Sequence, residues 1–281
     1  MSAGLPARGA PTAVVKVGGE VVADPTALAN LGAGLRALAE SRVRLAVVHG
    51  GGPQASALQK RLGFEPQVVA GRRITDDAAL EAVEMAVAGH VNVRLCAALR
   101  AAGLRAVGIS GSSAGLVDAV RRPPRVVSGG GPDAIDFGHV GDVVSIGVDL
   151  LEALWSAGFV PVVACLGSDA AGRVYNINAD VVANALAGAV SADHLLLVTS
   201  APGILSDPDD PNTRLSRLTH HEARAAIASG SIRGGMIPKV EESLAGLAGG
   251  VRAVHVLSAA APDALAREVR DPGSVGTVIL P

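Results

Sequence analysis

The sequence predicts an α/β fold, in which helices cover both faces of an open and mainly parallel β-sheet. Two observations support this fold class. Short apolar runs without polar alternation, as expected of strands buried on both faces, take turns along the chain with Ala- and Leu-rich stretches of helical length. Glycine-rich turns follow several of these runs. Because ligands bind at the carboxyl ends of strands in such sheets, a site is expected at these turns.

The predicted elements follow one another in chain order. Strands are expected at Ala13–Val17, Leu45–Val48, Arg105–Ile109, Val160–Ala164, Leu195–Thr199 and Val254–Leu257. Helices are expected at Pro25–Glu40, Gln54–Leu62, Asp77–Ala88, His90–Ala102, Asp149–Ala157, Ala179–Val190, His220–Ala228 and Ile237–Leu247. Asp24 and Asn178 are expected as N-caps, and Thr75 or Asp76 caps the helix from Asp77. Between Ala114 and Ser145, Gly and Pro clusters separate pairs of Val, which predicts β-hairpins.

Composition narrows the range of functions. The 281 residues are 49% hydrophobic and 18% charged, enough for a large core in one α/β unit or two fused lobes. The net charge of −2 gives no basis for a nucleic-acid or membrane partner. We find no apolar run long enough to span a bilayer and no signal-peptide core in Met1–Thr12, and therefore expect a cytoplasmic protein. Cys96 and Cys165 are interpreted as buried free thiols, and the seven His lack metal-ligand spacing, so no metal site is expected.

Lysine is unusually rare in this chain. Only Lys16, Lys60 and Lys239 occur among 24 basic residues, and the other 21 are Arg. Lys60 lies at a predicted helix end, whereas Lys16 and Lys239 both lie beside glycine pairs. A compact ammonium group and a planar guanidinium are not interchangeable where one small charge must reach a phosphate. Lys16 and Lys239 are therefore candidates for direct contact with an anion.

Three glycine loops suit the binding of anions. They are Val15–Gly19 after the first strand, His49–Pro53 before a helix, and Gly234–Lys239 entering another helix. Glycine N–H groups allow phosphate oxygens to approach closely, and a helix N-terminus adds partial positive charge. A glycine pair after a strand is often a plain turn, but three such loops with two of the three lysines favour a phosphate site. The Walker P-loop and an ordered G-x-G-x-x-G are absent.

Two polar segments complete the candidate site. Tyr175–Asp180 precedes an apolar helix, where Asn178 can cap and Asp180 can either favour the helix dipole or orient lysine side chains. The pair Arg72 and Arg73 is either a solvated surface pair or places one guanidinium on a carboxylate. Read from the residues alone, the sequence predicts an α/β protein that handles an anion.

Taken together, these features resemble the amino acid kinase family, from Val14 to Ile279. The segments that carry the resemblance are VVKVGG at Val14–Gly19, VVHGGGPQ at Val47–Gln54, GRRITD at Gly71–Asp76, VGISG at Val107–Gly111, GHVGDVVSI at Gly138–Ile146, YNINAD at Tyr175–Asp180, PGILSD at Pro202–Asp207, GGMIPKVE at Gly234–Glu241 and VGTVI at Val275–Ile279. The chain departs from the family pattern with Ser200 in place of Asp, Cys165 in place of Pro, and Ser112–Ala114 in place of Lys-Asp-Gly.

The resemblance implies a three-layer αβα sandwich on one continuous sheet. Residues 1–175 would form the lobe for the acyl substrate, with a hairpin lid, and residues 176–281 the lobe for ATP. By the same resemblance, Lys16 and Lys239 would flank the transferred phosphoryl group, held in place by Asp180. The other implied contacts are Gly18 and Gly19 with the phosphates, Gly51 and Gly52 with the acceptor carboxylate, Arg73 and Asn176 with the other carboxylate of the substrate, and Ser200, Gly203, Ile204, Leu205 and Ile232 with the nucleotide. Mg²⁺ would be bound by the phosphates, without a protein cage.

Within the family, the motifs are most similar to those of members that phosphorylate the side-chain carboxylate of N-acetyl-L-glutamate in arginine biosynthesis. A kinase for N-acetyl- or carrier-bound 2-aminoadipate in lysine biosynthesis stays open, although such relatives usually alter the third glycine and the Pro-Gln of the HGGGPQ loop. A non-catalytic nucleotide sensor is a further alternative, against which the retained lysines argue. The missing fingerprint disfavours a NAD-dependent enzyme. We expect a homodimer without strong arginine feedback, because the segment before Lys16 is short and rich in Gly, Pro and Ala.

Overall fold

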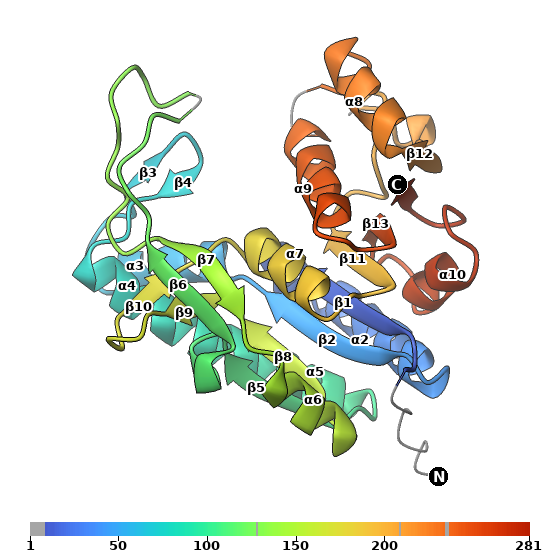
Figure 1. The fold of residues 1–281 in the computed structure, drawn as a ribbon, viewed down its shortest axis with the longest axis horizontal. Helices are drawn as coiled ribbons and strands as arrows, with labels where there is room; N and C mark the ends of the chain where they lie inside the picture. The colour runs from blue at the N-terminus through green and yellow to red at the C-terminus, as the bar shows by residue number, and fades with distance from the viewer. Residues whose placement is uncertain (1–8, 128, 208, 234–235) are drawn as a thin grey trace.

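An eight-stranded sheet runs through the whole molecule (Figure 1). The computed structural model describes residues 9–127, 129–207, 209–233 and 236–281. The strand order is β12-β14-β13-β11-β1-β2-β8-β5, and all neighbouring strands are parallel except β13 and β14. The predicted α/β fold with a mainly parallel sheet is therefore confirmed.

The bounds of the elements are as follows. The strands are β1 Thr12–Val17, β2 Arg44–His49, β3 Val68–Val69, β4 Arg72–Arg73, β5 Ala106–Ser110, β6 Val117–Arg121, β7 Gly141–Ile146, β8 Val160–Ala164, β9 Leu166–Ser168, β10 Val174–Asn176, β11 His194–Thr199, β12 Arg217–Thr219, β13 Ala253–Ser258 and β14 Thr277–Leu280. The helices are α1 Gly19–Ala23, α2 Pro25–Glu40, α3 Gly52–Arg61, α4 Asp77–Val83, α5 Asn92–Ala101, α6 Asp149–Ser156, α7 Ala179–Ala189, α8 His220–Ala228, α9 Met236–Ala248 and α10 Ala264–Arg270, with a π-helix at Glu84–Val91 and 3₁₀ turns at Ser113–Gly115 and Pro211–Thr213.

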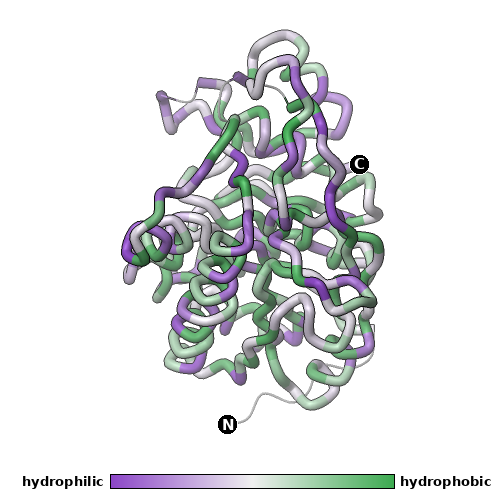
Figure 2. Tube along the Cα trace, turned by 90° about the vertical axis from the view of Figure 1, so that its left-hand side faces the viewer, coloured by the Kyte–Doolittle hydropathy of each residue, from purple (hydrophilic) through white to green (hydrophobic). Residues whose placement is uncertain are grey.

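Each face of the large sheet carries its own hydrophobic core. One core lies between the sheet and helices that include α6, α7 and α9, and the other between the sheet and α2, α5 and α10. Successive side chains of a strand point to opposite faces, so Val14 belongs to the first core and Val15 to the second. The hydrophobic segments gather in the interior of the molecule, as Figure 2 shows. The chain thus forms three layers, αβα.

The middle of the chain forms a second, smaller sheet. Its strand order is β10-β9-β6-β7, and β6 and β7 pair antiparallel with a register shift between Asp118 and Ala119. This pairing confirms the hairpins expected between Ala114 and Ser145. A two-stranded β3–β4 hairpin lies above it, on the left of Figure 1. Together these elements form one side of the molecule.

The prediction of separate helices at Asp77–Ala88 and His90–Ala102 is wrong. The helix is continuous from Asp77 to Ala101, with π-helical turns between α4 and α5. Gly89 does not break it, because the wider π turns absorb this residue. By length and composition alone this helix of 25 residues could cross a membrane. Its inner face, which includes Val83 and Leu95, is buried in the two cores, as in a packed domain.

The predicted N-caps are confirmed. The Asp24 carboxylate accepts the N–H groups of Thr26 and Ala27, the Asp76 carboxylate accepts that of Ala79, and the Asn178 carbonyl oxygen accepts that of Asp180 at 2.7 Å. The elements that the sequence analysis missed are short. They are α1, α10, β3, β4, β9, β10, β12 and β14.

Candidate functional site

Lys16 and Asp180 form an ion pair at the centre of the molecule. Lys16 lies on β1, between Val48 of β2 and Leu197 of β11, on the same face as Val14. Its Nζ is 2.8 Å from Oδ1 of Asp180, in the first turn of α7, and both side chains are mostly buried, with 18% and 12% exposed. Burial alone would lower the pKa of Lys16, but the charge of Asp180 and its hydrogen bond raise it above its usual value. The ammonium group is therefore held charged at the carboxyl end of the central strand.

Lys239 reaches the same place from α9. Lys16, Asp180 and Lys239 line one cavity of about 220 Å³, so the structure brings the three predicted catalytic residues together. Among the described residues, Asp180 contacts Lys16 directly but makes no ion pair with Lys239. The sequence analysis did not identify two further groups that line the cavity, Glu20 and Glu242. Burial, followed by the charge of Asp180, raises the pKa of Glu242 to about 7.

The first two glycine loops meet beside this cavity. Gly18 donates its N–H to the carbonyl of Val198 at 3.3 Å, and Gly19 begins α1, where the first N–H groups have no partner within the helix. Nε2 of Gln54, from the second loop, donates to the carbonyl of Gly19 at 2.9 Å. A Cβ at Gly51 would lie 3.1 and 3.2 Å from the side chains of Val91 and Val87, so glycine is favoured there. The glycines of the third loop, Gly234 and Gly235, lie outside the described residues.

The second loop opens into a larger cavity of about 700 Å³. All four predicted substrate-binding residues line this cavity: Gly51, Gly52, Arg73 and Asn176. The guanidinium of Arg73 donates to the Gly52 carbonyl at 3.0 Å and to the side chains of Gln59 and Ser56. Arg73 has no ion pair with an acidic side chain in the described part of the chain, and burial lowers its pKa. A half-buried cation without a counter-charge is suited to a ligand carboxylate.

Three more arginines line the larger cavity. Arg122 is paired with Asp142 at 2.6 Å, whereas Arg72 and Arg125 are exposed and pair with no acidic side chain that the structure describes. They come from β4 and from the segment after β6, far apart in sequence. The sequence analysis singled out the adjacent pair Arg72 and Arg73, but it missed Arg122 and Arg125, whose approach depends on the tertiary fold. The cavity is therefore strongly cationic.

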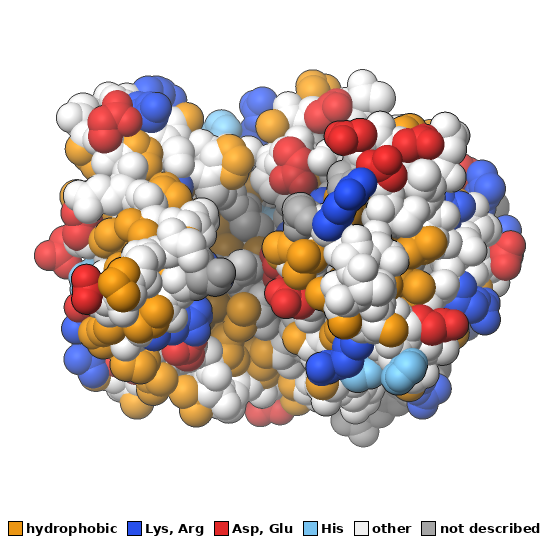
Figure 3. All heavy atoms as spheres, turned by 90° about the horizontal axis from the view of Figure 1, so that it is seen from above, with side chains coloured by type: hydrophobic (Ala, Val, Ile, Leu, Met, Phe, Trp, Pro, Cys, Tyr) orange, Lys and Arg blue, Asp and Glu red, His pale blue; other side chains and the backbone are white. Residues whose placement is uncertain are grey.

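Seen from above, the molecule is hollowed between the half that carries β3 and β4 and the half that carries α8 and α9 (Figure 3). The smaller and larger cavities share no lining residue, but both lie around α7, whose first turn supplies Asp180 to one and Ala179 to the other. A third cavity of about 390 Å³ lies at the ends of β11 and β13 and is lined by Ser200.

Of the other predicted nucleotide contacts, Gly203, Ile204 and Leu205 follow β11, and Ile232 follows α8. The side chains of Ile204, Leu205 and Ile232 are buried in the core, and Gly203 lies against Thr277. The Ile204 N–H donates to Oγ1 of Thr277 at 2.8 Å, and the Ile204 carbonyl accepts from Leu215. These buried side chains therefore hold the loop after β11 against the core.

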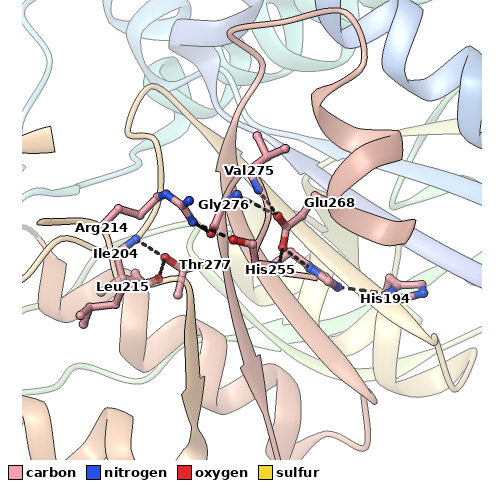
Figure 4. A network of polar contacts seen from close by, with 10 residues as sticks. His194, Ile204, Arg214, Leu215, His255, Glu268, Val275, Gly276 and Thr277 are labelled. Carbon is pink, nitrogen blue, oxygen red and sulfur yellow. Dashed lines mark hydrogen bonds and ion pairs between the residues drawn. The ribbon is translucent and has the colours of Figure 1, made fainter. Parts of the chain in front are cut away.

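A buried polar network, which the sequence analysis missed, anchors this loop (Figure 4). The Glu268 carboxylate accepts N–H groups from Gly273, Val275 and Gly276 at 2.7 to 3.0 Å, and its Oε1 lies 3.0 Å from Nδ1 of His255. Burial alone would raise the pKa of Glu268, but these hydrogen bonds lower it overall. Arg214 bonds to the Gly276 carbonyl, so the network links α10 to the segment after the nucleotide loop.

His49, at the end of β2, is held by an equally specific set of bonds. Its Nδ1 is 2.9 Å from the Gly50 carbonyl and its Nε2 is 2.9 Å from Nδ2 of Asn92. The second Asn92 hydrogen points to the Val162 carbonyl at 2.9 Å. Burial lowers the pKa of His49 to about 4, so the ring is neutral, with Nδ1–H as donor. This arrangement fixes the loop that opens the larger cavity.

No group of three or more His, Cys, Asp or Glu side chains in the described ranges is arranged to hold a metal ion. Cys165 lines the larger cavity and is buried, and burial raises the pKa of its thiol to about 12. The site therefore offers ammonium, guanidinium and backbone N–H groups, which bind oxyanions.

Comparisons with known proteins agree with this chemistry. The model of the amino acid kinase family matches residues 11–258. The chain is 53% identical to an acetylglutamate kinase of Sorangium cellulosum over 268 residues, which are 95% of this chain and 94% of that protein. It is 52% identical to an acetylglutamate kinase of Anaeromyxobacter dehalogenans, with 95% and 99% of the two chains covered. The structure also resembles N-acetylglutamate synthase from Neisseria gonorrhoeae, with coenzyme A and N-acetyl-glutamate, at a TM-score of 0.79 and 26% identity; 96% of this chain and 59% of that chain are covered.

Proposed function

Because the chain belongs to the amino acid kinase family, we propose that it transfers the γ-phosphoryl group of ATP to the side-chain carboxylate of N-acetyl-L-glutamate, as a step of arginine biosynthesis. The product would be N-acetylglutamyl 5-phosphate. The observation that carries this proposal is the convergence of Lys16, Asp180 and Lys239 on one cavity beside a cationic cavity of substrate size. The intact HGGGPQ loop favours the glutamate-derived acceptor over an aminoadipate derivative.

The chemistry needs no general base. A carboxylate oxygen attacks the γ-phosphorus, the bond from that phosphorus to the bridging oxygen breaks, and ADP leaves with the electron pair. Catalysis then consists of alignment and neutralisation of charge on the phosphoryl group. We assign these tasks to Lys16 and Lys239, with Asp180 fixing Lys16 through their 2.8 Å ion pair. Gly18 and Gly19 would contact the phosphates.

The acceptor would lie in the larger cavity. Arg73 offers the uncompensated charge for the carboxylate that does not react, and Asn176, whose Nδ2 donates to Oγ1 of Thr75 at 3.1 Å, would orient it. Gly51 and Gly52, at the start of α3, would place the reacting carboxylate toward the smaller cavity. Nucleotide contacts at Ser200–Leu205 and Ile232 stay a proposal. Mg²⁺ would enter on the phosphates of ATP, because the described side chains form no cage for it.

The organisation of the whole protein is also a proposal. Residues 1–175 would carry the acyl substrate and 176–281 the nucleotide, with one sheet joining the two lobes. A homodimer is supported by exposed apolar side chains on the continuous helix, Met85 at 46% and Val93 at 65%. Light scattering of the purified protein would measure its mass. We also propose that the enzyme is cytoplasmic.

A hydroxylamine trap tests the activity. Purified protein, MgATP and each candidate acid are incubated with hydroxylamine, which converts an acyl phosphate into a coloured hydroxamate. We expect a signal with N-acetyl-L-glutamate that depends on ATP. A signal with N-acetyl-2-aminoadipate but not with N-acetylglutamate would reassign the acceptor. Nucleotide binding without a signal from any acid would favour a sensor.

A further inference from the structure

The smaller cavity contains more negative than positive side chains. Its two ammonium groups, Lys16 and Lys239, face three carboxyl groups, Glu20, Asp180 and Glu242. Asp180 is paired with Lys16. Glu20 is exposed and folds back over Gly18, where an added Cβ would lie 2.3 to 2.6 Å from its carboxyl atoms. The Glu242 side chain forms no ion pair or hydrogen bond in the described part of the structure.

Glu242 is held at the cavity by its position on α9. It follows Lys239 by three residues, so the two side chains lie on the same face of the helix. The Glu242 carbonyl accepts from Nδ2 of Asn184 on α7 at 3.1 Å, which ties the two helices together at this level. Glu241, the preceding residue, is exposed and does not line the cavity.

Several charged groups set the protonation of Glu242. Burial and the Asp180 charge raise its pKa to about 7, and Glu241 adds to this. Lys16 and Lys239 act in the opposite direction. Glu20 faces the same cavity from α1. Half of the Glu242 groups are thus ionised near neutral pH, before any further negative charge enters the cavity.

We propose that Glu242 binds a proton when the phosphates of the nucleotide enter the smaller cavity, so that nucleotide affinity is linked to pH through this residue. This inference depends on the proposed function, which brings the γ-phosphate between Lys16 and Lys239. The ionised Glu242 repels the phosphate oxygens at short range in a partly desolvated cavity. The neutral acid removes this repulsion and can donate a hydrogen bond to a phosphate oxygen. The overall step is nucleotide plus one proton plus ionised protein, giving the complex with neutral Glu242.

The size of the effect follows from the fraction of neutral Glu242. If only the neutral form binds well, the apparent affinity is reduced by that fraction. With a pKa of about 7, MgATP affinity falls about tenfold for each pH unit well above neutrality. The KM for ATP follows this change, whereas kcat at saturating ATP does not, because bound nucleotide has already selected the neutral form.

Calorimetric titration of MgATP into the protein without acceptor tests the inference. Titrations at pH values from 6.5 to 8.5, in pairs of buffers that differ in heat of ionisation, give both affinity and proton uptake. For the unchanged protein we expect uptake of about one proton at pH 8 and the loss of affinity described above. The Glu242→Gln variant should lose both the proton uptake and the pH dependence, and should bind MgATP about thirtyfold more tightly than the unchanged protein at pH 8.5.

Glu241→Gln is the matched control, since it removes a neighbouring carboxyl group outside the cavity. It should keep the loss of affinity with rising pH, with only a small downward shift of the pKa of Glu242, because the Glu241 charge is the smallest of the contributions to that pKa. Titration of ATP itself is common to all three proteins and cancels in the comparison. Equal pH slopes in the unchanged protein and Glu242→Gln, with MgATP binding intact, would overturn this inference alone. Absence of MgATP binding at every pH would overturn it together with the proposed function.

Discussion

The ammonium group of Lys239 is the most direct point at which to test the site. It lines the smaller cavity but lies on the surface of a helix, so its removal leaves no large void. We predict that Lys239→Ala lowers kcat by about 10²- to 10³-fold, as expected when one electrostatic contact to the transferring group is lost. The melting temperature should change little.

The matched control is Lys60→Ala, which removes the exposed lysine that lies 3.5 Å from Glu65. It should keep full turnover in the hydroxamate assay. Near-normal turnover in Lys239→Ala would refute the role assigned to that residue.

His49 predicts a pH dependence of stability. Its pKa in the folded protein is about 4, below the usual 6.5, so the unfolded chain binds more protons between these values. Stability must therefore fall as the pH drops from 6.5 towards 4, by roughly 3 kcal/mol from this residue alone. Protonation would place Nε2–H against the amide hydrogens of Asn92.

Urea unfolding at pH 7.5, 6 and 5 measures this effect. His49→Asn should be less stable at pH 7.5, because Asn92 loses an acceptor, but its stability should vary less with pH. His221→Asn, which removes an exposed histidine, is the control. An unchanged slope in His49→Asn would exclude His49 as the source.

At the residue scale, a local sequence signal identified three side chains that the structure brings to one cavity. Rare lysines beside glycines indicated Lys16 and Lys239, and the segment before a helix indicated Asp180. Glu242 gave no such signal, because its altered pKa arises from burial and from charges on three different elements. The network around Glu268 was missed for the same reason: its partners lie on separate strands and loops.

At the scale of elements, two glycines should respond to substitution in opposite ways. Gly89 lies in the π-helical turns with no atom within 4 Å of an added Cβ, so Gly89→Ala should stabilise the protein by about 0.5 kcal/mol through the unfolded state. Gly138 has φ +70°, and an added Cβ would lie 2.3 Å from the Thr75 carbonyl oxygen. Gly138→Ala should therefore destabilise it by roughly 2 kcal/mol.

Thermal unfolding of the two variants side by side provides the measurement. Gly138 borders the bonds that join Thr75 to Phe137 and His139, so its replacement should also weaken acceptor binding. A Gly89→Ala variant that melts earlier than the unchanged protein would show that the π turns need glycine.

The predicted elements show what a sequence can reveal about packing. Strands and caps were found because apolar runs and capping side chains act within a few residues. The break assigned near Gly89 was wrong because the helix continues there through π-helical turns, which the sequence pattern did not predict. The edge strand β12 and its neighbour β14 were missed because they have only three and four residues, too few to show a periodic pattern.

At the scale of the whole molecule, the two cavities predict separable ligand effects. A ligand at about 100 times its Kd stabilises a protein by about 2.7 kcal/mol. For a chain of this size that corresponds to an increase in melting temperature of about 5 °C. MgATP and N-acetyl-L-glutamate should each produce such an increase.

Arg73→Ala should abolish the increase with N-acetyl-L-glutamate and keep that with MgATP, because Arg73 lines only the larger cavity. Lys239→Ala should lose the increase in melting temperature with MgATP and keep that with N-acetyl-L-glutamate. Loss of both effects in Arg73→Ala would indicate that the cavities are not independent.

The register of β1 limits how the sequence of this strand can evolve. Val14 and Lys16 share one face of the strand, while Ala13, Val15 and Val17 fill the core on the other. A slip by one residue would exchange the two faces, bury the ammonium among hydrophobic side chains and remove it from Asp180. Any descendant sequence that folds in this register therefore already places Lys16 correctly. Core packing and the position of Lys16 depend on the same register of β1, so selection on stability and selection on phosphoryl transfer constrain the same strand.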